Sequence, residues 1–110
     1  MNISNVEDPE LLKIQLKACG DVLKVVDIVE PGLTKRRGQL LRSMTMIQLS
    51  LLRQSPPPGL VMMKQVKHLM MISSEVSRCL GADVGQEMQE ELSKTVRQVM
   101  MSQMSSGNQG

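Results

Sequence analysis

The segment LVMMKQVKHLMMISSEVSRCL, residues 60–80, carries the strongest structural signal in this chain. It follows three consecutive prolines and stops at Gly81, so both of its ends are marked. Mostly apolar residues recur along it at spacings of three and four, which places them on one face of a helix. That face consists of Met62, Val66, Leu69, Ser73, Val76 and Leu80. The adjacent Met63, Met70 and Met71 widen it, and we expect a central helix around which the other helices pack.

The composition is typical of one globular domain. The chain has 110 residues, of which 41% are hydrophobic and 22% are charged. Aromatic residues are absent and methionine occurs 11 times, so the core must be built from aliphatic side chains and methionine. Methionine is flexible and specifies packing weakly. The net charge of +2 is too balanced to indicate nucleic acid or an anionic membrane by itself.

A first helix is predicted over residues 8–30, with Asp8 as its N-cap and Pro9 as its first residue. Gly20 and Asp21 form a weak point at which this helix could bend or restart. The helix carries two apolar stripes. One stripe consists of Leu12, Leu16, Cys19, Leu23 and Val26, and the second consists of Leu11, Ile14, Ala18, Val22, Val25 and Val29.

Two further helices are indicated by capping residues and by helical spacing of apolar positions. Thr34 can cap one helix and Asp83 the other, and the segment SPPPG at residues 55–59 is a stiff connector. The sequence therefore predicts an all-α four-helix bundle with short loops and a methionine-rich core without aromatic residues. Its predicted parts are a flexible lead-in at residues 1–7, helices at about 8–30, 34–53, 60–80 and 84–104, and a flexible tail at residues 105–110.

Residue patterns for catalysis or metal binding are poor. Cys19 and Cys79 are far apart in sequence, His68 is the only histidine, and a metal site needs three or four ligands. His68 and Cys79 are separated by about 16 Å of rise on one helix, too far for a catalytic pair. We therefore expect no enzyme, cofactor or metal site. Without a secretory signal or an apolar run of roughly 20 residues, we expect an intracellular protein, cytoplasmic or nuclear.

Protein association is the favoured function. Methionines at adjacent positions point about 100° apart on a helix, so burying both requires wide coverage by the core or by a partner. We predict a helical interaction module that forms a homo-oligomer, a dimer or tetramer, or that completes a partner's bundle. The predicted interface is Met88, Leu92, Val96, Val99, Met100 and Met104, and the competing face is Met62, Met63, Met70 and Met71.

Two alternative functions remain open. A methionine-lined groove could bind or chaperone variable hydrophobic helices, because methionine repacks around different ligands. The run Lys35, Arg36 and Arg37 could contact an anion or nucleic acid, although no aromatic residue is available to stack on bases. These three cations oppose the macrodipole at the start of their helix, a local conflict of the kind found at functional sites.

Overall fold

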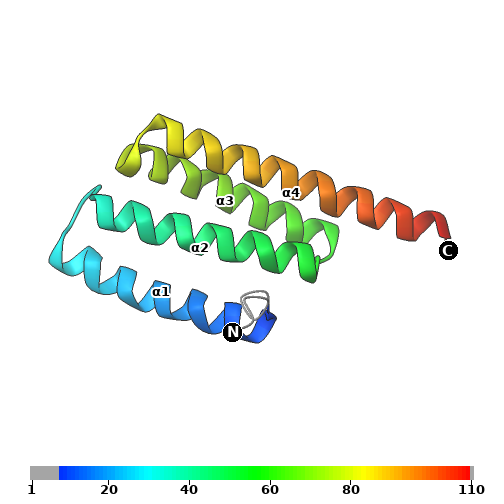
Figure 1. The fold of residues 1–110 in the computed structure, drawn as a ribbon, viewed down its shortest axis with the longest axis horizontal. Helices are drawn as coiled ribbons and strands as arrows, with labels where there is room; N and C mark the ends of the chain where they lie inside the picture. Colours follow the sequence, from blue (N-terminus) through cyan, green and yellow to red (C-terminus); the bar gives the residue numbers. More distant parts are fainter. Residues whose placement is uncertain (1–7, 110) are drawn as a thin grey trace, which may run out of the picture.

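The fold is an all-α bundle of four helices joined by short connections (Figure 1). It is seen in a computed structural model that describes residues 8–109, with side chains for residues 8–103. The predicted fold class is thereby confirmed, and the predicted lead-in at residues 1–7 lies outside the described part. The helices are α1 (Pro9–Val29), α2 (Lys35–Gln54), α3 (Gly59–Leu80) and α4 (Ala82–Gln109).

The predicted caps of the first two helices are present. A side-chain oxygen of Asp8 accepts a hydrogen bond from the backbone N–H of Glu10 at 3.0 Å. Likewise, Thr34 Oγ1 accepts one from the backbone N–H of Arg37 at 3.2 Å. Each bond satisfies an amide that has no partner within its own helix. The helix α1 continues through Gly20 without a break.

The connection between α3 and α4 is a single residue, Gly81. Its φ of 111° is favourable only for glycine, which explains why the helix ends there. The helix α4 starts immediately afterwards, at Ala82, so Asp83 lies in its first turn, and the prediction that Asp83 caps this helix is wrong. The helix also continues to Gln109, through residues 105–109 that the sequence suggested as a tail. Extending a helix that is already formed adds one hydrogen bond per residue and avoids the cost of nucleation.

The helix α2 is central, because it alone packs extensively against each of the other three. The expectation that residues 60–80 would form the central helix is therefore wrong: α3 packs mainly on α2 and α4. Its predicted apolar stripe does face the core. The buried clusters are Leu49, Leu52, Leu69 and Leu92 toward one end, and Leu41, Val76 and Met88 toward the other.

Small residues let α2, α3 and α4 approach one another closely. Thr45, Ser73 and Thr95 are fully buried, one on each of these helices. Thr45 and Ser73 each donate a hydrogen bond to the carbonyl four residues earlier, and Thr95 Oγ1 accepts one from Arg53 at 2.9 Å. The buried hydroxyls are thus satisfied and cost little on burial.

Two glycines complete this close packing. A Cβ added to Gly38 would lie 2.5 Å from the Cβ of Cys79, and one added to Gly85 would lie 2.5 Å from the Cβ of Ser77. The C-terminal end of α3 is therefore held between glycines of α2 and α4. No local pattern in the sequence indicates these contacts.

Candidate functional site

The helix α1 leaves one of its two apolar stripes uncovered. Its first stripe packs on α2, with Leu12 and Val26 buried. Its second stripe points away from the bundle, and Ile14 and Val25 keep 65% and 58% of their surface exposed. We call this second stripe the outward face of α1. It consists of Leu11, which is half-buried, and of the exposed Ile14, Ala18, Val22, Val25 and Val29.

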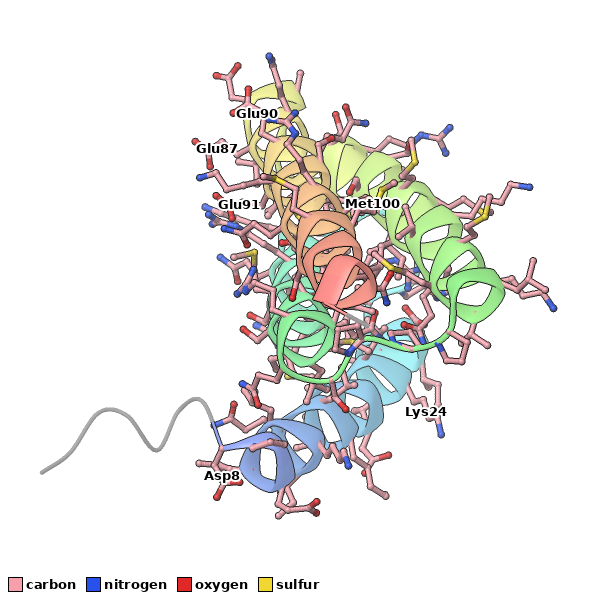
Figure 2. All side chains as sticks on the ribbon, turned by 90° about the vertical axis from the view of Figure 1, so that its right-hand side faces the viewer. Asp8, Lys24, Glu87, Glu90, Glu91 and Met100 are labelled. Carbon is pink, nitrogen blue, oxygen red and sulfur yellow. The ribbon has the colours of Figure 1, made fainter. Side chains whose placement is uncertain are left out.

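The outward face is open because α1 has only one extensive neighbour. In Figures 1 and 2, α1 lies at the edge of the molecule, with α2 between it and α4. The first core cluster contains no α1 residue, and Leu23 is the α1 residue packed against the second. A helix inside a closed bundle has two neighbours, and α1 lacks the second one. Ile28 on α1 and Leu33 in the turn into α2 are exposed as well.

The predicted interface on α4 lies mostly inside the molecule. Met88, Leu92 and Val99 are buried in the core, and Val96 packs against the first cluster. Met100 is 54% exposed, whereas the side chain of Met104 lies outside the described residues. The apolar stripe of α4 is accordingly used to hold α4 on α2 and α3, and Met88, Leu92 and Val99 are not open to a partner in this fold.

The competing methionine face on α3 is divided in the same way. Met62 is buried, whereas Met63, Met70 and Met71 are exposed. Met70 shares a shallow groove of about 430 Å³ with Met100 across the α3–α4 surface. In Figure 2, Met100 lies on the side of α4 that faces α3. The rest of the lining is Val66, Gln89, Leu92, Ser93, Val96 and Arg97.

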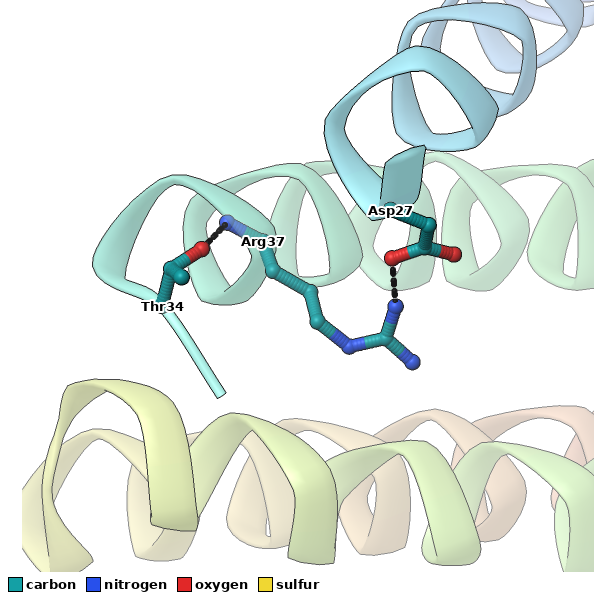
Figure 3. A network of polar contacts seen from close by, with 3 residues as sticks. All are labelled: Asp27, Thr34 and Arg37. Atoms are coloured by element: carbon teal, nitrogen blue, oxygen red, sulfur yellow. Dashed lines mark hydrogen bonds and ion pairs between the residues drawn. The ribbon is translucent and has the colours of Figure 1, made fainter. Parts of the chain in front are cut away.

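The basic cluster is largely neutralised within the chain. Arg36 lies 3.2 Å from a carboxylate oxygen of Glu30, and Arg37 pairs with Asp27 (Figure 3). Both carboxylates belong to the end of α1, so the pairs join α1 to the start of α2. Lys35 is exposed, and no ion pair to it is seen among the described side chains.

A larger hollow of about 720 Å³ separates the N-terminal parts of α1 and α3. Leu16, Leu51 and Leu52 form apolar parts of its wall, while Lys64 and His68 line its α3 side. It shows that α1 and α3 stand apart at this end of the bundle. The hollow is open and shallow, and no described polar side chain within it is buried without a partner.

Neither cysteine lines these two hollows. Burial raises the pKa of the Cys79 thiol, nearby Arg37 lowers it, and Glu75 raises it further, so the thiol stays protonated at neutral pH. Cys19 and Cys79 are free and half-buried. No group of three His, Cys, Asp or Glu residues suited to a metal ion occurs in the described part of the chain. None of the described helices is apolar enough over sufficient length to cross a bilayer.

Comparison with protein-family models, with curated proteins and with solved structures finds no match to this chain. Sequence analysis recognised the second stripe of α1 but did not name it as an interface. The signal was available, because a first helix followed by the tight turn at Pro31 and Gly32 has only one neighbour in sequence to cover two stripes.

Proposed function

We propose that the protein is a non-enzymatic helical interaction module that binds a second helix on the outward face of α1. The binding helix comes from another copy of the chain or from a helical partner whose bundle it completes. The observation that supports this proposal is the row of exposed Ile14, Val22, Val25 and Val29 on a helix with one extensive neighbour. These four side chains keep between 48% and 69% of their surface exposed.

The energetic gain from covering the outward face is comparable in size to the cost of association. Fully burying one Val or Ile side chain contributes about 1.5–3 kcal/mol, and these side chains are roughly half exposed. Together they contribute several kcal/mol, against an association cost of about 4–15 kcal/mol. We therefore expect a reversible complex whose population depends on concentration.

A charge placed on the outward face tests the proposal. Val25→Lys should weaken self-association, or binding of a neutral amphipathic helical peptide, by at least about tenfold, because the lysine amine would be desolvated by the partner. Light scattering across a dilution series reports self-association, and fluorescence anisotropy of the labelled peptide reports partner binding. Circular dichroism of each variant verifies that the fold is kept.

Ser74→Lys is the matched control, because it adds the same charge at an exposed position on α3. It should leave both measurements unchanged. Equal binding by the wild type and Val25→Lys, or the absence of both kinds of binding in the wild type, would contradict the proposal.

The groove between α3 and α4 supports a second candidate function, the binding of variable hydrophobic helices. Met70 and Met100 line it from two helices, and both side chains are about half exposed and free to change rotamer. This candidate predicts that Met100→Glu, and not Val25→Lys, abolishes peptide binding. The anion-binding alternative is weakened by the pairing of Arg36 with Glu30 and of Arg37 with Asp27.

A further inference from the structure

We propose that the helix bound on the outward face of α1 is α1 of a second copy, packed antiparallel, with Ile14 of one copy level with Val25 of the other. This inference rests on the proposed function and names its partner. It follows from the charges that border the outward face and from the sizes of the residues on it.

The charge balance of α1 favours another protein helix over an anionic surface. Within α1, the three lysines are matched by three acidic residues. Helices that lie on anionic membranes carry an excess of lysine and arginine along their polar side. The charged residues are Lys13, Lys17, Lys24, Glu10, Asp21 and Asp27. A neutral helix can pack against a copy of itself without net repulsion.

The order of charges selects the antiparallel orientation. Lys17 and Asp21 lie on the same edge of the outward face, 3.2 Å apart and both largely exposed. In a two-fold antiparallel pair, this edge of one copy meets the same edge of the other. A parallel two-fold pair would instead place this edge against the other edge of the second copy, where Gln15 and Cys19 lie, so the two charges would have no charged partner there.

The register of the two helices follows from two alignments. Opposite charges lie level with each other, and so do the large apolar side chains. When Ile14 is level with Val25 of the second copy, Lys17 lies within one residue, about 1.5 Å of helix rise, of Asp21 in that copy. The two-fold axis then passes near Ala18, the smallest residue of the outward face. A small residue at the centre lets the helix axes approach closely, while the longer Ile14 fills space farther out.

Disulfide trapping tests the orientation and the register. In a Cys19→Ser, Cys79→Ser background, Ile14→Cys and Val25→Cys are prepared as separate proteins. Their oxidised equimolar mixture should give a cross-linked dimer of one chain of each kind. Each protein alone should not cross-link, because its own cysteines lie about 16 Å apart along the pair, beyond the roughly 7 Å Cα separation that a disulfide allows.

A charge-mixing experiment tests the same contact independently. Lys17→Asp leaves two acidic residues at the edge of the face, and Asp21→Lys leaves two lysines. Each variant alone should dimerise about tenfold more weakly than the wild type, and their equimolar mixture should recover wild-type affinity. Recovery on mixing cannot arise from the Lys17–Asp21 contact within one chain, because that contact is broken in both variants.

The outcomes separate this inference from the proposed function. Cross-linking by Ile14→Cys alone would indicate a parallel pair or another antiparallel register, and either would overturn the inference. A monomer at every concentration, with no cross-link in the mixture, would also overturn it. In either case, the proposed function would stand if the wild type binds the helical peptide and Val25→Lys abolishes that binding. It would fail if the wild type showed neither self-association nor peptide binding.

Discussion

At the scale of single residues, the bundle depends on positions where a side chain would not fit. Gly38 on α2 lies against Cys79 and Leu80 on α3, and an added Cβ would come within 2.7 Å of Leu80 Cγ. Gly20 on α1 is different, because its added Cβ would meet only the end of Met44 at 3.9 Å. A side chain at Gly38 would therefore disturb the packing of α2 on α3, whereas a methyl group at Gly20 would fit.

We predict that Gly38→Ala destabilises the protein and Gly20→Ala stabilises it. Alanine gains about 0.5–1 kcal/mol over glycine inside a helix, which is the whole effect expected at Gly20. At Gly38, the clash with the end of α3 costs about 1–3 kcal/mol and outweighs this gain. Urea denaturation of both variants measures the free energy of unfolding. Equal stabilisation by the two substitutions would show that α2 and α3 are not packed as closely as described.

The contrast between local and tertiary signals explains what the sequence could predict. The caps at Asp8 and Thr34 depend on neighbours within three residues, so their prediction was confirmed. The contact of Gly38 with Cys79 joins positions far apart in the chain, and no local pattern encodes it. For the same reason, periodicity identified Met88 as an apolar face residue but could not tell core from interface.

At the scale of elements, charges that are unfavourable at the ends of α1 and α2 are paired with each other across the turn that joins the two helices. Asp27 lies in the last turn of α1 and Arg37 in the first turn of α2, so each charge opposes the macrodipole of its own helix. Their pairing, together with that of Arg36 and Glu30, offsets the conflict across the turn. Two of the cations at the start of α2 therefore have acidic partners at the end of α1.

Exchanging the two charges should therefore stabilise the hairpin. The double variant Asp27→Arg, Arg37→Glu keeps an ion pair and gives both helix ends favourable charges, so we expect a gain of about 0.5–1 kcal/mol at low salt. Lys35→Glu is the control for α2 alone, because it changes the dipole interaction without removing a described pair. Urea denaturation at two salt concentrations measures both. A double variant less stable than the wild type would show that the geometry of the present pair outweighs the dipoles.

At the scale of the whole molecule, the four helices are not equally held. The helices α2, α3 and α4 share the buried clusters and the small-residue contacts, whereas α1 rests mainly on α2. The molecule is elongated, 52 × 33 × 25 Å, and the end of α4 projects past the other helices in Figure 1. Local opening should follow this difference in packing, with α1 at the low-stability end.

Native-state hydrogen exchange should reveal that order directly. In dilute protein, we expect the amides of α1 to exchange faster than those at the centres of α2 and α3, because opening α1 exposes the least buried surface. If a second copy covers the outward face, raising the total protein to about 100 times the dimer dissociation constant brings the free monomer to about 7 times that constant. This stabilises α1 by about 1.2 kcal/mol and slows its exchange roughly tenfold. Val25→Lys should abolish the concentration dependence and leave exchange in α3 unchanged. Slow exchange throughout α1 at every dilution would mean instead that α2 alone holds α1 in place, and that the outward face needs no partner to be stable.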